Sequence, residues 1–190
     1  MVIAAALEQE LSNPAYTVSI AAPGYLNFLL TDEVLTQNLQ RILTEKEQYG
    51  SVVQEVPLTI NNEFVSANPT GPLHIGNGRG GFFGDSLTQL LRKMGHRVTS
   101  EYYVNDGGEQ VVKLGHSVLK DDEAVYGGEY IDELHAALTQ GDEQDAVTVG
   151  RKAAATILEQ YIQKTLTQKM HITYDTFTSE RALLESGTVE

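Results

Sequence analysis

Residues 63–77 read EFVSANPTGPLHIGN, and this stretch decides how the chain around it folds. Residues 64–65 are a phenylalanine and a valine, which favour a strand, and residues 68–72 have the composition of a turn. Proline lacks an N–H and fixes φ, so the two prolines end the strand and lead into a helix. The first amides of that helix have no partner within it, so we expect a phosphate-binding site beside His74 and Asn77.

A βαβ unit is predicted around this stretch. After Asn77, apolar residues recur at helical spacing and mark the expected buried face of a helix: Phe83, Leu87, Leu90, Leu91 and Met94. Gly95 is expected to end that helix, and residues 97–104 to form the next strand. The order strand, helix, strand implies a parallel sheet with a right-handed crossover. Ligands bind at the carboxyl ends of such strands, so residues 66–68 and 105–106 should lie side by side.

The C-terminal part of the chain is predicted to be largely helical. A helix after Asp106 would bury Val111, Leu114 and Val118. Residues 120–150 contain one lysine and nine acidic residues, and we interpret them as an acidic insertion that is exposed on at least one face. Its short helical pattern has three apolar positions: Ile131, Leu134 and Leu138. A long helix is expected from about residue 145 to 170, and a strand is expected to begin at Ile172.

The first 47 residues have the pattern of a small helix–strand–strand–helix unit. Residues 2–11 should form a short amphipathic helix, with an apolar face made of Ile3, Leu7 and Leu11. Residues 16–20 alternate in polarity and residues 25–30 are apolar, which predicts a hairpin across Pro23-Gly24. A second helix, from 32 to about 47, would bury Leu35, Leu39 and Ile42. Because two strands and two helices are too few for a complete domain, we expect further sequence before this unit. A linker is expected after it, at 48–57.

Composition narrows the functional classes. The chain has 190 residues, a formal net charge of −13 and no cysteine. The charge argues against a general nucleic-acid-binding surface, because phosphate contacts need Lys and Arg. The lack of cysteine excludes disulfides and thiolate metal sites, and it agrees with a cytosolic protein. The sequence has no transmembrane pattern, so no membrane partner is expected, and no signal-peptide pattern.

Two alternative interpretations of the central stretch are weaker. Residues 76–81 read GNGRGG and match the letters of the dinucleotide-binding fingerprint G-x-G-x-x-G, which would predict an NAD-dependent oxidoreductase. That fingerprint needs its first glycine directly after a strand, whereas here residues 69–75 intervene. A metal site is not expected either, because His74 and Asn77 have no further His or Cys at ligand spacing.

The stretch from Glu63 to Gln110 closely resembles the signature region of bacterial arginyl-tRNA synthetases, class I enzymes with a His-x-Gly-His motif. Here the motif reads HIGN at 74–77, with an Asn that also occurs in the family. Residues 22–28 (APGYLNF) and 179–187 (SERALLESG) resemble flanking family segments. The resemblance implies an α/β fold: the first half of a class I Rossmann-like nucleotide-binding domain with a parallel sheet, residues 57–190. It would be preceded by part of a small α+β tRNA-reading domain, residues 1–50.

The resemblance also implies the activity and the site residues. The activity would be that of an arginine–tRNA ligase, with L-arginine, ATP, Mg²⁺ and tRNA(Arg) as partners, in a cytoplasmic monomer. The catalytic residues, which would stabilise charge on the α-phosphate, would be His74 and Asn77. The ATP site would consist of His74, Gly76 and Asn77. The arginine site would consist of Glu63, Ser66, Ala67, Asn68, Asn77, Asp106 and Gln110. The tRNA contacts would be made by Tyr25 and Asn27.

The chain also departs from a whole enzyme of this family. It lacks the second class I signature, Lys-Met-Ser-Lys-Ser, and the second half of the nucleotide-binding fold. It also lacks the groups that grip the guanidinium and the anticodon-binding domain. We therefore expect a fragment that is inactive by itself. The alternative is a standalone tRNA- or nucleotide-binding paralogue without ligase activity.

Overall fold

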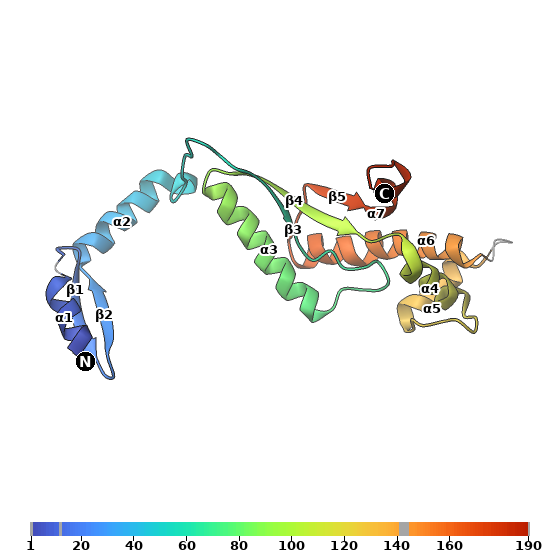
Figure 1. Cartoon of the computed structure of the whole chain (residues 1–190), viewed down its shortest axis with the longest axis horizontal. Coiled ribbons are helices and arrows are strands. Elements are labelled where there is room, and N and C mark those ends of the chain that lie inside the picture. Colours follow the sequence, from blue (N-terminus) through green and yellow to red (C-terminus); the bar gives the residue numbers. More distant parts are fainter. Residues whose placement is uncertain (1, 12, 141–144, 190) are drawn as a thin grey trace. The chain divides into compact units, whose positions relative to one another are not determined.

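The computed structural model describes residues 2–11, 13–140 and 145–189. The chain forms two compact units, Met1–Ser51 and Val52–Glu190 (Figure 1). Both units mix helices and strands, and the second contains a parallel sheet, so the α/β class is confirmed. Among the described residues, no helix is long and apolar enough to cross a membrane.

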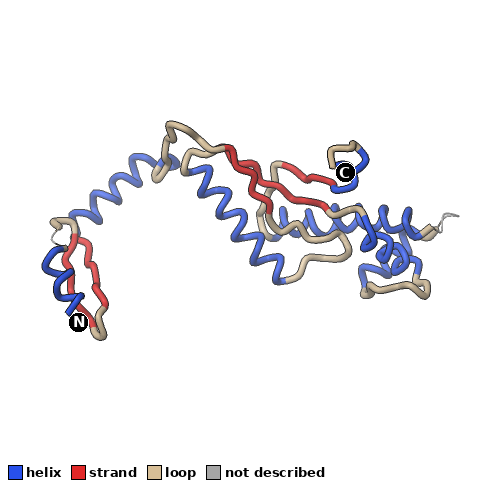
Figure 2. The backbone as a smooth tube through the Cα atoms, in the orientation of Figure 1, coloured by secondary structure: helices blue, strands red, loops and turns tan. Residues whose placement is uncertain are grey.

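The N-terminal unit contains the predicted hairpin between two helices (Figure 2). Helix α1 spans Val2–Glu10, and strands β1 (Tyr16–Ala21) and β2 (Tyr25–Leu30) pair antiparallel. Helix α2 spans Asp32–Glu45 and ends in a 3₁₀ turn, η1, at Lys46–Gln48. The alternation of polar and apolar residues in β1 and the acidic first turn of α2 were sufficient local signals for these elements.

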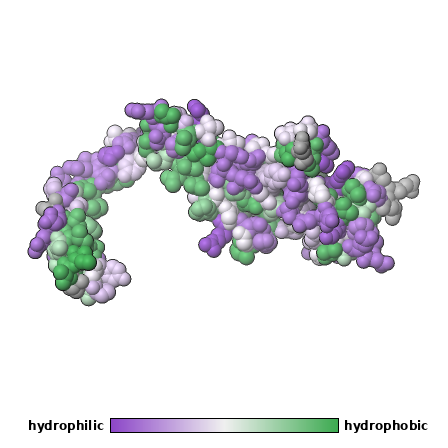
Figure 3. All heavy atoms as spheres, in the orientation of Figure 1, coloured by the Kyte–Doolittle hydropathy of each residue, from purple (hydrophilic) through white to green (hydrophobic). Residues whose placement is uncertain are grey.

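The predicted buried face of α2 is wrong, and the apolar face of α1 is largely exposed. Ala4 is the buried residue of α1, and α2 has none. The apolar positions expected inside are exposed instead: Ile3, Leu7, Leu35, Leu39 and Ile42. The hairpin contacts α1, whereas α2 leads away from it, so no sheet surface of the unit covers the apolar side of α2. Apolar side chains consequently appear on the surface of this unit in Figure 3.

The second unit contains the predicted βαβ arrangement. Strand β3 spans Thr59–Glu63, helix α3 Ile75–Lys93 and strand β4 Arg97–Val104. A third strand, β5 (Thr176–Ser179), completes a sheet of order β3-β4-β5, in which both pairs are parallel. The parallel sheet and the helical crossover confirm the prediction from residues 63–104.

The predicted bounds of two strands need correction. Strand β3 ends at Glu63, before the phenylalanine and valine that were expected to extend it, because Val65 and Ser66 have φ angles of +66° and +41°. Strand β5 begins at Thr176, not at Ile172. The Ile172 amide donates to Leu166 O at 2.9 Å and its side chain is buried, so this residue closes the preceding helix.

The second unit also contains further helices and two π-helical segments. Their bounds are α4 Gly108–Leu119, α5 Glu129–Leu138, α6 Ala146–Thr156, η2 Ile157–Gln163, η3 Thr165–Lys169 and α7 Glu180–Glu185. Helix α6 and the two π-helical segments together form the long helix predicted from about 145 to 170. The core lies between β4, α4 and this long helix, around Tyr102, Leu114 and Ile157.

The acidic segment 120–150 is exposed along one face, as expected, but its other face belongs to the core. Ile131 and Leu134 of α5 are buried, and His135 Nδ1 lies 2.7 Å from Val118 O. Residues 146–150 already belong to α6. Residues 141–144 of the expected insertion lie outside the described residues. The short helix predicted in this acidic segment is therefore α5, and it packs against α4.

The buried face of α3 also differs from the prediction. The side chains of Phe83 and Leu90 are 72% and 59% exposed, and the buried residues are Gly81, Gly84 and Thr88. The reason lies at the end of β3, where the ring of Phe64 occupies the space above the helix. A Cβ atom at residue 84 would lie 2.2 Å from that ring. The helix thus approaches the sheet through glycine and not through its large apolar residues.

Candidate nucleotide-binding site

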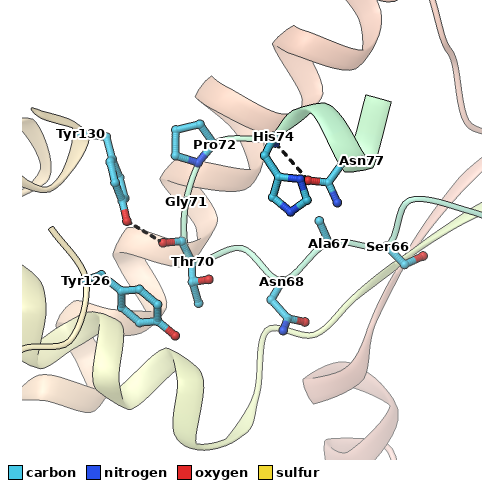
Figure 4. A pocket seen from close by; sticks show the side chains of 10 residues that line it. All are labelled: Ser66, Ala67, Asn68, Thr70, Gly71, Pro72, His74, Asn77, Tyr126 and Tyr130. Carbon is cyan, nitrogen blue, oxygen red and sulfur yellow. Dashed lines mark hydrogen bonds between the residues drawn. The ribbon is translucent and has the colours of Figure 1, made fainter. Parts of the chain in front are cut away.

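A cleft with a volume of about 500 Å³ opens where β3 gives way to α3 (Figure 4). One wall is the chain from the end of β3 to the first turn of α3, and the other comes from the α4–α5 segment. The cleft is lined by Ser66, Ala67, Asn68, Thr70, Gly71, Pro72, His74, Asn77, Tyr126 and Tyr130. Five of the predicted site residues are therefore brought together: Ser66, Ala67, Asn68, His74 and Asn77.

Two tyrosine side chains, one from β4 and one from the chain before β5, hold the segment 64–67. The Tyr102 hydroxyl donates to Ala67 O at 2.8 Å, and the Tyr174 hydroxyl donates to Phe64 O at 3.1 Å. Burial raises the pKa of Tyr102 and of Tyr174, so both hydroxyls remain protonated donors at neutral pH. These two bonds hold the chain in place on both sides of the left-handed residues.

The left-handed backbone at residues 65–66 has a structural function. A valine with φ of +66° is a strained residue, and such strain persists only where surrounding bonds impose it. Here the turn brings Ser66 Oγ to within 3.1 Å of Tyr103 N, which donates to it in place of a further sheet partner. Ser66 therefore lies beyond the end of β3 while its hydroxyl still accepts a hydrogen bond from β4.

Asn68 meets Gln110 at the start of α4. Its Nδ2 donates to Gln110 Oε1 at 2.6 Å, so these two predicted arginine-site residues are in direct contact. The predicted neighbour of residues 66–68 at the end of β4 was the Asn105–Asp106 pair. Instead, the contact between the chain after β3 and helix α4 is made by Gln110.

Asp106 does not line the cleft with residues 66–68. Its carboxylate accepts hydrogen bonds from Ser179 Oγ at 2.7 Å and from Arg181 N at 3.1 Å. Both donors lie at the start of α7. It lines two other cavities, each with Arg151 and Arg181. The carboxylate thus joins the ends of β4 and β5.

Glu63 is the last residue of β3 and does not line the cleft. Desolvation and the charges of Glu180, Glu63 and Asp106 raise the pKa of the Tyr103 hydroxyl. Glu63 therefore lies near a group of carboxylates at the carboxyl end of the sheet.

His74 is the N-cap of α3, and its side chain is held by the helix that it caps. Its Nδ1 accepts from Gly76 N at 3.1 Å, and Asn77 Oδ1 accepts from His74 N at 3.0 Å (Figure 4). This reciprocal arrangement is a capping box. It corrects one expectation, because the Gly76 amide is not free but is already bonded to the imidazole.

The capping box determines which polar atoms remain available to the cleft. Because Nδ1 of His74 is an acceptor, the neutral ring carries its proton on Nε2. Because Asn77 uses its oxygen, its Nδ2 group remains as a donor. Gly76 leaves room for this geometry, since a Cβ atom there would lie 3.0 Å from His74 Cε1. Two donors therefore stand at the helix start, next to the positive end of its dipole.

The charge of the cleft differs from that of the whole chain. The formal net charge of the chain is −13, yet the described lining residues include no aspartate or glutamate. Among the described residues, no cluster of His, Asp and Glu is placed to hold a metal ion. A cleft with neutral amides, hydroxyls and a histidine suits an anionic or polar ligand better than a cationic one.

Tyr126 and Tyr130 were not singled out from the sequence, although both line the cleft. The available signal was two aromatic residues flanking Gly127-Gly128 within an otherwise polar, acidic stretch. Aromatic rings in such a stretch indicate burial or ligand contact. Only the packing of α5 against α4 shows that they face residues 68–72.

The residues predicted to contact tRNA lie in the N-terminal unit. Tyr25 and Asn27 both belong to β2, and both are exposed. Residues two apart in a strand point to the same face, so these two side chains share one face of the hairpin.

Comparison with known proteins places this chain in a family. The family model described as tRNA synthetases class I (R), catalytic domain, matches residues 38–174. An arginine–tRNA ligase of a Wolbachia from Brugia malayi is 38% identical, over 91% of this chain and 33% of that protein. The ligase of Bartonella quintana is 36% identical, over 87% and 32% of the two chains.

A solved structure agrees with this assignment. The crystal structure of an arginyl-tRNA synthetase from Campylobacter jejuni matches with a TM-score of 0.68 and 33% identity, over 82% of this chain and 38% of that one. The chain spans about a third of the length of the curated relatives that it matches. By its matched residues, the chain belongs to the class I arginyl-tRNA synthetase catalytic-domain family.

Proposed function

We propose that this chain supplies part of the active site of an arginine–tRNA ligase. In the reaction, a carboxylate oxygen of arginine attacks the α-phosphorus of ATP, and the bond to the β-phosphate oxygen breaks and releases pyrophosphate. The 2′-hydroxyl of the terminal adenosine of tRNA(Arg) then attacks the arginyl carbonyl and releases AMP. The family membership and the donor-rich cleft support this proposal.

The helix start would bind the phosphates of ATP, which enters as its Mg²⁺ complex. His74 Nε2 and Asn77 Nδ2 are hydrogen-bond donors at the positive end of the α3 dipole, with Gly76 between them. As negative charge develops on the α-phosphate oxygens in the transition state, these preorganised donors stabilise it without moving. The capping box is the observation that carries this assignment, because it orients both side chains before substrate arrives.

The segment after β3 would bind arginine. Ser66 and Ala67 are held by β4, and the Asn68 side chain is held by Gln110. Asn77, across the turn, would contact the reacting carboxylate. Glu63 and Asp106 would contribute negative charge from the carboxyl end of the sheet. Neither of these carboxylates lines the cleft.

The remaining partners follow from the same assignment. Tyr25 and Asn27 would contact tRNA from the exposed hairpin of the N-terminal unit. Residues 1–50 would be part of the tRNA-reading domain, and residues 57–190 the first half of the catalytic domain. The enzyme would act as a cytoplasmic monomer.

The experiment measures arginine- and tRNA-dependent ATP consumption by the full-length gene product and by its His74→Asn variant. Asparagine is a good N-cap residue, so the variant keeps the start of α3 and loses only the imidazole. Loss of one preorganised donor should lower kcat by roughly 100-fold.

His171→Asn is the matched control. His171 is exposed, does not line the cleft and has a φ of +57°, which asparagine tolerates. Its activity should equal that of the wild type. Equal activity of the His74→Asn variant and the control would overturn the function given to His74.

A further inference from the structure

We propose that Tyr130 is a positioning residue of this site. Its hydroxyl holds the turn between residues 68 and 74, and so sets the distance between the two parts of the cleft that bind arginine and ATP. The kinetic test of this inference rests on the proposed function, whereas the exchange test described below does not.

The turn 69–72 connects the two parts of the site. On one side, Asn68 is held by Gln110, and on the other, His74 is held by its own capping box. Between them, the Tyr130 hydroxyl donates to Thr70 O at 3.1 Å (Figure 4). Among the described residues, this is the one side-chain hydrogen bond that joins the turn to another helix or strand. The position of the turn therefore depends on α5.

Gly71 makes room for this contact. A Cβ atom at residue 71 would lie 3.2 Å from the Tyr130 hydroxyl oxygen and 3.4 Å from Cζ. The φ of Gly71 is not in the left-handed region, so backbone conformation does not require glycine here. Close approach of the tyrosine is thus the reason for the missing side chain.

Tyr130 is itself held firmly. Its ring makes an edge-to-face contact with Tyr161 of the long helix, at 6.4 Å between centroids and 70° between planes. Helix α5 is anchored by its buried residues Ile131 and Leu134. Desolvation by burial raises the pKa of Tyr130, so the hydroxyl stays protonated and remains a donor across the neutral pH range.

The kinetic test compares Tyr130→Phe with Tyr161→Phe in the full-length protein. Both variants lose one hydroxyl that stabilises α5, since Tyr161 bonds to Glu133, but only Tyr130 reaches the turn. Tyr130→Phe should lower kcat roughly threefold to tenfold, as expected for one hydrogen bond, with KM for ATP and arginine within about twofold. Tyr161→Phe should leave kcat within about twofold of the wild type. Equal loss of kcat in both variants would overturn the proposal.

A second test uses hydrogen exchange and needs no activity. In Tyr130→Phe, amides of the stretch 69–78 should exchange roughly threefold to tenfold faster than in the wild type. In Tyr161→Phe they should exchange at the wild-type rate. Unchanged exchange in Tyr130→Phe would overturn the proposal even in a protein with no ligase activity. Faster exchange without any wild-type activity would instead contradict the proposed function alone.

The contact at Gly71 gives a third measurement. Gly71→Ala alone should push the tyrosine hydroxyl away and speed exchange in the same stretch. In the Tyr130→Phe background the hydroxyl is absent, so the added methyl group should have a smaller effect. Additive effects of the two substitutions would mean that the hydroxyl and residue 71 are not coupled, and would contradict the proposal.

Discussion

Both faces of α3 carry glycines, but one face packs against the rest of the unit and the other is open. The packed face is Gly81, Gly84, Thr88 and Arg92, and it lies against the end of β3 and the chain before β5. The open face is Gly76, Arg79, Gly80 and Phe83, and it borders a hollow of about 360 Å³. A glycine on the packed face makes room for core side chains. On the open face, by contrast, a Cβ atom at Gly80 would meet nothing within 4 Å.

The role of a glycine in a helix therefore depends on which atoms a side chain at that position would contact. At Gly84, a Cβ atom would overlap the Phe64 ring, and at Gly81 it would meet Met170 Cε at 2.8 Å. At Gly78 and Gly80, it would meet nothing within 4 Å. Glycine weakens a helix at all four positions. At Gly81 and Gly84, the close neighbouring side chains explain why the position carries no side chain of its own.

The largest effect is expected for Gly84→Ala. The added methyl group would lie 2.2 to 2.5 Å from three atoms of Phe64, a ring fixed by its contact with Tyr174. Overpacking of this kind costs roughly 3 kcal/mol of unfolding free energy. Urea denaturation of the full-length protein measures it. A wild-type midpoint would mean that α3 can move off the sheet, and the distinction between its faces would fail.

A smaller loss is expected for Asp175→Asn, which removes the ion pair at the end of the packed face. Asp175 Oδ2 accepts from Ser100 N at 2.6 Å and also bonds Arg92. Losing the charge should cost about 1 to 2 kcal/mol, measured by urea denaturation at pH 7.

The effect of Asp175 should depend on pH. The Ser100 amide, followed by the Ser100 hydroxyl and Arg92, lowers the pKa of Asp175 below its usual 3.8. A lowered folded-state pKa gives stability that is present above the unfolded pKa and disappears as pH falls through the folded pKa. The wild type and Asp175→Asn should therefore differ in unfolding free energy at pH 5 to 7, and the difference should shrink as the pH falls below 3.8. A difference that stays constant as the pH falls below 3.8 would contradict this assignment.

Gly76→Ala tests the open face where it borders the site. The methyl group would press against the His74 ring at 3.0 to 3.1 Å and displace it, while the packing of the core stays intact. We expect the affinity for ATP to fall roughly threefold to tenfold, because a displaced His74 ring would lose about one hydrogen bond to ATP. Calorimetric titration measures the affinity and thermal denaturation the stability. Loss of stability instead of affinity would assign Gly76 to the packed face.

The smallest effect, and one of opposite sign, is expected for Gly78→Ala. Nothing lies within 4 Å of its added methyl group, and alanine is the better helix former by up to about 1 kcal/mol. The variant should be slightly more stable in urea denaturation. It is also the matched control for Gly76→Ala, two residues away. A destabilised Gly78→Ala protein would show that a further part of the molecule covers this face.

Several elements were predictable because their signals are local. The two prolines at 69 and 72 required a break between strand and helix, and α3 begins at Ile75. Strand β4 has the predicted bounds Arg97–Val104, and α4 buries the three predicted apolar residues. The buried faces of α2 and α3 were mispredicted, because helical spacing identifies an apolar stripe but not which neighbour covers it.

The sequence by itself determined the βαβ unit, the family motif HIGN at 74–77 and the gathering of residues 66–68 with it. Those features depend on backbone restrictions and on neighbours a few residues apart. Only the tertiary structure decided that Asp106 turns to Ser179, that the His74 ring bonds to Gly76, and that Tyr130 faces Thr70. Each of these depends on side-chain contacts whose geometry no spacing rule specifies. Packing brought a tyrosine from an acidic, apparently peripheral segment to the turn that joins the two parts of the site.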